Sequence, residues 1–381
     1  MTDAVAFGAT ATAPVERGWR WFVLAVALMV AISLTPVWPP ALALVSGVVR
    51  LLLPIEQFVL LVVVAIAACT IVGWWAGGRL VVAMFWSAIA GVLLWKVTLS
   101  SSGYGAFARG WSMVLGASFG LVCFATASRP FLSRAIAAVS LAGIVTVLGF
   151  AGRSSAGAGV FDASSRMMGF EYQRRVDEAM SAWRRRTDSQ AWQAFARSMP
   201  DAAARAERSV SVVGALGRAP SADRRAARGP LLVLAPALLA LESVLALALG
   251  WAAYHRLSRA RIGPPLGTVR TMRFNDQWIW GLVVGITLLL LPTLVEWRSV
   301  GMNFVAFFGL LYMVRGVGVL LWWIPDRWAW LLPVGLVVLI PLLGPVRVLA
   351  ALAAITFGIG LSDTWRDFRS SAATRRPESR T

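Results

Sequence analysis

The sequence predicts an all-α, polytopic membrane protein: a transmembrane helical bundle of about ten spans, with one helical segment outside the membrane. Of its 381 residues, 58% are hydrophobic and only 14% are charged, whereas a soluble domain carries about 25% charged residues. Apolar runs of roughly 17 to 24 residues recur along most of the chain, and a helix needs this length to cross a hydrocarbon core about 30 Å thick. Many of the 19 tryptophans lie where these runs meet polar loops, as expected for rings at the headgroup interface.

The candidate spans form two sets, separated by a long polar stretch. The first run follows Arg17 and Arg20 and resembles a signal anchor. Pro40 to Leu53 offers only about 14 apolar residues and contains Arg50, so we expect it to enter the membrane and turn back without crossing. The ten predicted spans are residues 21–35, 57–74, 80–95, 111–127, 131–150, 231–254, 278–295, 304–323, 328–343 and 346–361.

The arginines of the short loops give the orientation. Most of them lie on one side of the membrane when both termini are cytoplasmic, which the positive-inside rule favours. We therefore expect a multi-pass protein of the inner (plasma) membrane with both termini in the cytoplasm. The predicted regions are a cytoplasmic N-terminal tail (1–18), N-terminal transmembrane helices (19–150), an extramembrane basic helical segment (151–229), C-terminal transmembrane helices (230–362) and a cytoplasmic basic tail (363–381).

The extramembrane segment has the pattern of two amphipathic helices. Val176, Met180 and Trp183 recur at helical spacing, and Thr187 with Gln190 forms a capping-box pattern at the start of a second helix. Two interpretations remain open: the helices lie on the membrane surface or on loops, or they dock a partner.

The net charge of +18 results from 36 Lys and Arg against 18 Asp and Glu. The basic residues flank apolar runs, and no nucleic-acid recognition motif accompanies them, so we expect anionic lipid headgroups as their partner and no nucleic acid. Cys69 and Cys123 both fall inside apolar runs, which makes a disulfide framework unexpected.

Few residues are available for catalysis. The single histidine, His255, and the single lysine, Lys96, both lie at span ends. A zinc-protease helix, a phosphate-binding loop with its lysine, or a serine–histidine pair inside the membrane therefore cannot be assembled. We predict that the protein is not an enzyme and that it holds no cofactor or metal.

Two opposite charges lie inside apolar runs at similar depth. They are Glu242 and Arg315, and a charge at the bilayer centre costs about 2.5 to 3.5 kcal/mol on insertion scales. We expect them to face the bundle interior and pair, either as a structural ion pair or as a substrate or proton site. Tyr312, one turn before Arg315, adds a donor on the same face. Pro236 disrupts helix hydrogen bonding near Glu242, which leaves backbone carbonyls available.

Glycines repeat at four-residue spacing inside or at the edge of three spans. Small residues at this spacing let helix backbones approach closely, and we expect packing within the chain more than between chains. The pairs are Gly73 with Gly77, Gly116 with Gly120, and Gly281 with Gly285.

The last predicted span leaves the membrane through the run GIGLSDTWRDFR, Gly358 to Arg369, which includes Asp363, Trp365 and Asp367. This run resembles the end of the YybS-like family of uncharacterised bacterial polytopic membrane proteins, a domain of unknown function. The resemblance extends upstream, and its parts are Pro236 with the leucines after it, Phe274 to Gly281, and Asn303 to Gly318.

The YybS-like family has no established substrate. Its fold is likened to the substrate-binding subunits of energy-coupling vitamin transporters and to membrane subunits of the cell-shape machinery, and a likeness of fold does not assign a function. The sequence favours an integral membrane protein that binds or transports a small molecule between its helices, at Glu242, Arg315 and Tyr312. The alternative is a membrane scaffold or assembly protein that recruits a protein partner through the basic extramembrane helices.

Overall fold

The computed structural model of the protein is helical over most of the residues it describes, and the described part contains no strand. The described residues are 55–98, 103–126, 129–151, most of 174–211, 230–258, 262–271, 274–324, 335, 339 and 345–366.

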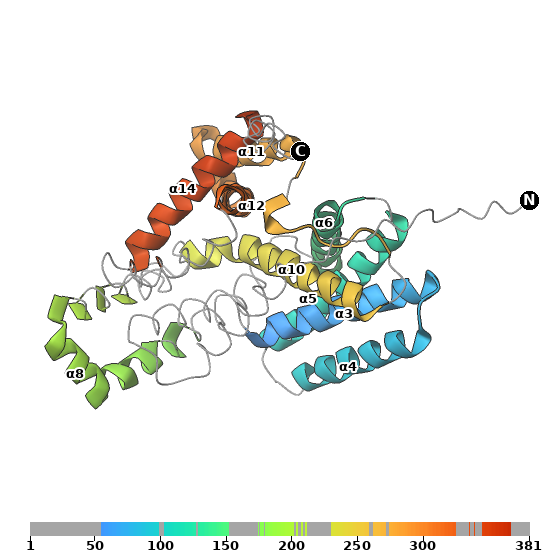
Figure 1. Ribbon diagram of the computed structural model, residues 1–381, viewed down its shortest axis with the longest axis horizontal. Helices are drawn as coiled ribbons and strands as arrows, with labels where there is room; N and C mark the ends of the chain where they lie inside the picture. The colour runs from blue at the N-terminus through green and yellow to red at the C-terminus, as the bar shows by residue number, and fades with distance from the viewer. Residues whose placement is uncertain are drawn as a thin grey trace, which may run out of the picture.

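Five helices form the N-terminal group, in which α3 is central because α4, α5 and α10 all contact it (Figure 1). Gly116 of α5 lies against Val64 of α3, and Gly250 of α10 lies against Ala65, so closely that a β-carbon at either glycine would overlap its neighbour. The helices are α3 (Ile55–Trp75), α4 (Leu80–Thr98), α5 (Gly103–Ala125), α6 (Phe131–Ala151) and α10 (Pro230–Leu257).

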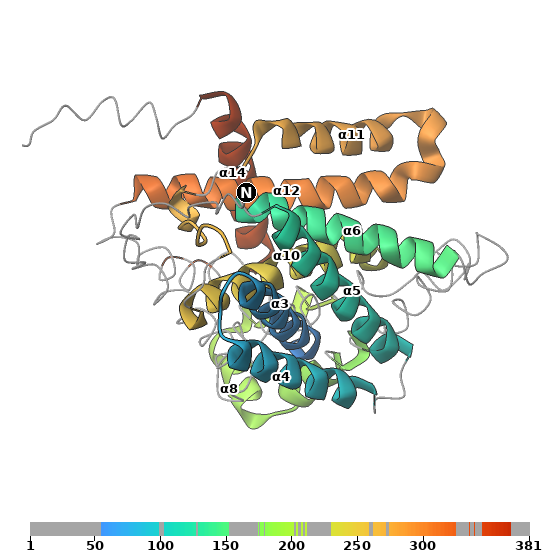
Figure 2. The same ribbon diagram turned by 90° about the vertical axis from the view of Figure 1, so that its right-hand side faces the viewer.

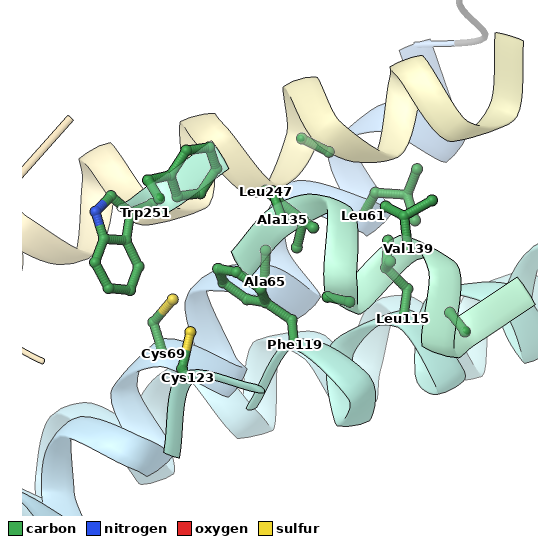
Figure 3. Packing of buried hydrophobic residues seen from close by; sticks show 14 of the residues in the cluster. Leu61, Ala65, Cys69, Leu115, Phe119, Cys123, Ala135, Val139, Leu247 and Trp251 are labelled. Atoms are coloured by element: carbon green, nitrogen blue, oxygen red, sulfur yellow. The ribbon is translucent and has the colours of Figure 1, made fainter. Parts of the chain in front are cut away.

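The core of this group lies where α3, α5, α6 and α10 meet (Figure 3). Phe119 and Trp251 are buried there, with their ring centroids 6.1 Å apart in an edge-to-face arrangement. Cys69 and Cys123 lie at one end of the cluster and are free, buried cysteines. A disulfide was not expected, and the structure agrees.

Three helices and a 3-10 turn form the C-terminal group: α11 (Ile279–Leu290), η3 (Pro292–Trp297), α12 (Arg298–Trp323) and α14 (Pro345–Arg366). α11 and α12 lie side by side as a hairpin, and α14 crosses α12 (Figure 2). Gly281 of α11 lies against Phe308, and Gly285 lies against Phe304 and Val305.

The predicted packing at the glycine pairs is confirmed within the chain for five of the six positions. Gly73 lies against Tyr254, and Gly120 lies within van der Waals distance of Val72 and Ala68, in addition to the contacts given above. Gly77 differs, because nothing lies within 4 Å of its would-be β-carbon. Gly77 instead lies in the turn after α3 with a φ of 91°, a backbone conformation that favours glycine.

Large apolar side chains also cover the outside of the bundle. Val81 and Trp95 of α4 are 76% and 69% exposed, and Leu290 at the end of α11 is 74% exposed. An apolar outer surface of this kind is unfavourable in water and suits the hydrocarbon of a bilayer. The helices therefore fit an integral membrane protein.

Among the described residues, five helices are long and apolar enough to cross a membrane, so the prediction of about ten spans is not confirmed. The segment from Pro40 to Leu53 and the predicted span 21–35 lie outside the described residues, as does 328–343 apart from residues 335 and 339. The five candidates are Phe58–Trp75, Gly105–Ala125, Phe131–Gly149, Val233–Leu257 and Pro292–Trp323.

The predicted span 278–295 is corrected by the structure. α11 has 12 residues, which gives a length of about 18 Å, too short for the hydrocarbon core. The helix ends because Leu291 is extended and Pro292, which has no N–H and starts η3, cannot continue it. η3 and α12 then follow without a gap and form one long apolar stretch, Pro292–Trp323. This stretch runs back alongside the short helix α11.

Asn303 repairs the break that Pro236 makes in α10. Pro236 has no N–H, and its ring disturbs the hydrogen bonds of the preceding turn. Oδ1 of Asn303 accepts from the N–H of Ala237 over 2.9 Å, and Nδ2 of Asn303 donates to the backbone oxygen of Val233 over 2.7 Å. Backbone carbonyls near Pro236 were expected to remain available. The Val233 carbonyl instead accepts from Asn303, and the two bonds join α10 to α12.

Replacing Asn303 by leucine is expected to lower the free energy of unfolding by about 1 to 2 kcal/mol, because two backbone groups at the helix break lose their partner. The measurement is thermal unfolding of the purified protein in detergent. Thr287→Val is the control, since the Thr287 hydroxyl donates to the backbone oxygen of Val283 within its own helix. Equal shifts for the two variants would show that the bridge between the helices contributes nothing.

The segment that the sequence predicts to lie outside the membrane contains a small apolar core in its described residues. Trp192 of α8 (Gln190–Ser198) is 4% exposed and packs against Trp183 and Phe195, with ring centroids 5.0 and 5.5 Å apart. The predicted capping box is wrong, because Ser189 caps α8 by accepting from the N–H of Trp192. α8 lies at one end of the molecule in Figure 1.

Candidate functional site: a buried arginine between two carboxylates

Arg315 is the buried charge around which the C-terminal helices pack. It lies on α12 and is only 5% exposed. Its Nε donates to Oδ2 of Asp363 over 2.9 Å, and its Nη2 donates to the backbone oxygen of Asp363 over 3.2 Å. Its Nη1 donates to Oδ1 of Asp276 over 2.7 Å. One guanidinium therefore joins α12, α14 and the 3-10 turn η2 (Asp276–Trp278).

The two carboxylates have opposite environments. The side chain of Asp363 is 1% exposed, whereas that of Asp276 is 59% exposed. Asn275 holds Asp276 in place, because the Asn275 side chain caps η2 by accepting from the N–H of Gln277. The cluster is therefore closed on the α14 side and open on the η2 side.

Aromatic rings enclose the guanidinium further. Cζ of Arg315 lies 5.2 Å from the ring centroid of Phe274, within the range of a cation–π interaction. Phe274 meets Tyr312 edge to face, with centroids 5.2 Å apart. Tyr312 is fully buried one turn before Arg315, on the face that helical spacing predicted.

Two hydroxyl groups of this cluster are buried and make no hydrogen bond within the described part of the chain. They belong to Tyr312 and Thr364. The two side chains lie within interacting distance of each other, although their hydroxyls do not reach the geometry of a well-formed hydrogen bond. Most buried polar atoms in proteins have a partner, and leaving one unsatisfied costs about 1 to 3 kcal/mol.

A glycine crossing places Asp363 on Arg315. Gly316 of α12 and Gly360 of α14 meet so closely that a β-carbon on Gly316 would overlap the Thr356 carbonyl, and one on Gly360 would overlap the Tyr312 carbonyl. Arg315 is adjacent to the first glycine, and Asp363 follows the second by three residues, on the same helical face. Close approach of the backbones thus makes the short ion pair possible.

The residues that the sequence singled out are only partly brought together. Arg315 and Tyr312 share one cluster. Glu242 is buried on α10, but the carboxylates that the structure places on Arg315 are Asp276 and Asp363, which differs from the expected pair. Ser243, next to Glu242, accepts from Nε1 of Trp111 over 3.0 Å and so belongs to the N-terminal group.

The C-terminal motif extends the helix beyond the predicted span. α14 continues to Arg366, so Asp363 lies inside a helix although the predicted tail began there. Trp365 points outward and is 69% exposed. Asp367 and Arg369 lie outside the described residues.

A second buried arginine was missed because it stands next to a loop in the sequence. Arg134, near the start of α6, is fully buried, and its Nη1 donates to the backbone oxygen of Ile262 over 3.0 Å. Its guanidinium lies 5.1 Å from the ring centroid of Trp251. Gly263, with a φ of 145°, lets the chain pass close by, because a β-carbon there would overlap the guanidinium.

The single histidine belongs to the same arrangement. Nδ1 of His255 lies 3.1 Å from the backbone oxygen of Trp251, and Nε2 lies 3.0 Å from that of Gly263. Nε1 of Trp251 donates to the backbone oxygen of Pro264 over 3.1 Å. His255 and Trp251 therefore hold the segment that follows α10, and these contacts give the histidine a structural role.

The segment between α10 and α11 contacts both helix groups. Its first part is held by the N-terminal group through the contacts just described. Further along, Nη2 of Arg270, in the 3-10 turn η1 (Val269–Thr271), donates to the backbone oxygen of Ile324 at the end of α12. Asp276 then reaches Arg315. The open carboxylate of the site thus belongs to a connector between the two groups.

Comparison with known proteins gives one finding. Residues 195–364 match the model of a family described as "Predicted membrane protein (DUF2232)". No curated protein and no solved structure matches the chain. The matched stretch contains Arg315, both of its carboxylates, Tyr312 and Thr364. Over residues 195–364, the chain is therefore similar to a family of predicted membrane proteins of unknown function.

Proposed function

We propose that this membrane protein binds a small molecule between its C-terminal helices, in the cluster around Arg315, as a transporter or its binding component would. The observation that carries the proposal is the buried Tyr312 hydroxyl, which makes no hydrogen bond within the described residues. If the cluster were only a structural ion pair, burying the Tyr312 hydroxyl without an acceptor would cost free energy. A ligand that accepts a hydrogen bond from this hydroxyl would remove the cost.

The open side of the cluster supports the same proposal. The Asp276 side chain is more than half exposed, so the buried Arg315 is bonded directly to a residue at the surface of the protein. Binding is proposed without a catalytic step, and the protein is proposed to work in the inner membrane with both termini in the cytoplasm.

Tyr312→Phe tests the proposal, because it removes one hydroxyl and little else. Without ligand, we expect the free energy of unfolding to stay equal or to rise by about 1 kcal/mol, since an unsatisfied polar atom is lost. The small molecule that co-purifies with the wild-type protein from native membranes should be retained about tenfold less, because its hydrogen bond to the hydroxyl is lost. The measurement is mass spectrometry of the bound fraction.

Tyr254→Phe is the matched control. Tyr254 is also fully buried, but it lies in the N-terminal group against Gly73. This control should leave ligand retention unchanged. If Tyr312→Phe and Tyr254→Phe retain the same small molecules as wild type, the proposed site is wrong.

A scaffold role is the second candidate, and the extramembrane segment supports it. Because Trp192 and Ala203 form part of a core within the segment, its charged side chains face outward. Arg184, Arg185 and Arg197 are exposed, and such a surface suits an acidic protein partner or anionic lipid.

A further inference from the structure

We propose that the ligand of this site carries a single carboxylate, and that it binds by replacing the Asp276 carboxylate on Nη1 of Arg315. This inference rests on the proposed function and names its ligand class. It follows from the unequal attachment of the two internal carboxylates, from the charge of the cluster and from the position of the unbonded hydroxyls.

Asp363 is a built-in partner of Arg315. It contacts the guanidinium through both its side chain and its backbone oxygen, it is almost completely buried, and it lies beside the glycine crossing. Removing one member of such a buried pair strongly destabilises a protein. A ligand therefore does not gain by displacing Asp363.

Asp276 is an exchangeable partner. It makes one contact to Arg315, over 2.7 Å, and its side chain is 59% exposed on a short 3-10 turn. Exposed ion pairs contribute little to stability, because water solvates the carboxylate equally well when it leaves. Nη1, in contrast, belongs to the Arg315 side chain, which is only 6% exposed, so it continues to need an anion when Asp276 departs.

The charge of the cluster selects one negative charge. Arg315, Asp363 and Asp276 together carry one net negative charge, so a monocarboxylate that replaces Asp276 on Arg315 leaves this charge unchanged. A phosphate with two negative charges would raise it to two beside the buried Asp363. A hydrogen bond from Nη1 to a carboxylate oxygen is charge-assisted, and it is therefore stronger than one to a neutral acceptor.

The remaining groups suit the rest of a carboxylate ligand. The hydroxyls of Tyr312 and Thr364 can donate to its second oxygen, since both lack a partner within the described residues. Phe274 covers the guanidinium and meets Tyr312 edge to face, so it offers an apolar surface to the ligand's carbon skeleton.

The test uses the full-length protein in lipid nanodiscs and fluorinated probes observed by fluorine NMR. A free carboxylate is represented by 4-fluorobenzoate and a lipid-derived one by 8-fluorooctanoate, each compared with its own neutral amide. At least one carboxylate should bind saturably, and its amide should bind at least about tenfold more weakly. Binding of the benzoate alone indicates a free metabolite, and binding of the octanoate alone indicates a lipid-derived acid.

The direction of the change in affinity that Asp276→Asn causes is the decisive result. Loss of the competing carboxylate should tighten binding of the carboxylate probe about fivefold, the ratio expected when a partly exposed ion pair no longer has to be broken. Glu296→Gln, an equal change of charge at an exposed position of η3, should leave the affinity unchanged.

Weaker or unchanged binding in Asp276→Asn would overturn the inference. So would equal binding of acid and amide, or no binding of either acid, although the proposed function then stands if Tyr312→Phe still loses the co-purified molecule. If Tyr312→Phe also retains that molecule, both the inference and the proposed function fail.

Discussion

Replacing Gly360 by leucine is expected to separate α12 from α14 and to destabilise the protein by at least about 3 kcal/mol. A β-carbon at this position would overlap the Tyr312 carbonyl and lie 2.8 Å from the Gly316 nitrogen. Backbone atoms cannot move aside as a flexible side chain can, so the helices must part where they cross in Figure 2. The measurement is thermal unfolding in detergent, together with the yield of monodisperse protein.

Gly358→Leu is the matched control on the same helix. Gly358 is exposed, and nothing lies within 4 Å of its would-be β-carbon. Because leucine favours a helix over glycine by about 1 kcal/mol, this variant should be equally or slightly more stable. A similar loss in both variants would mean that helix α14, and not its crossing with α12, responds to the substitution.

Replacing Arg315 by methionine is expected to destabilise the protein by about 3 to 5 kcal/mol, because the Asp363 carboxylate stays buried without its countercharge. The second substitution Asp363→Leu should restore most of this loss, since an apolar pair of similar volume can replace a buried ion pair. Unfolding of both single variants and of the double variant gives the coupling energy directly. If the double variant lost as much stability as the two single variants together, Arg315 and Asp363 would not be energetically coupled.

The double variant also separates stability from binding. It should fold, because no buried charge is left alone, but it should not retain a ligand that needs the guanidinium. The Asp363→Leu single variant is expected to be unstable for the same reason as Arg315→Met, since it removes the buried carboxylate that balances the charge of Arg315.

Hydropathy predicted the membrane helices and placed Arg315 and Tyr312 inside one of them, but it could not predict the partners of Arg315. Asp276 precedes an apolar run and Asp363 follows one, so both were assigned to regions outside the membrane. The structure shows instead that α14 continues past Asp363. The signal that could have found this pair is the spacing of Gly360 and Asp363, which puts the carboxylate one turn after a close-packing glycine.

Other errors have a common physical cause. Periodicity shows that a residue can lie in a helix, but not which neighbour its side chain meets. The sequence therefore did not single out Arg134, although it is fully buried beside Trp251. Backbone carbonyls near Pro236 were expected to be available, although the Val233 carbonyl accepts from Asn303. Both contacts join residues more than 60 positions apart, which no local pattern contains.

The most direct test of a ligand site at Arg315 is an experimental structure of the full-length protein in lipid nanodiscs, purified with its co-purifying small molecules. We expect the guanidinium on Asp363, with non-protein density that contacts the Tyr312 hydroxyl and lies where Asp276 otherwise reaches Nη1. An Arg315 side chain that faces the acyl chains, or a Tyr312 hydroxyl bonded to protein with no density beside it, would contradict the account.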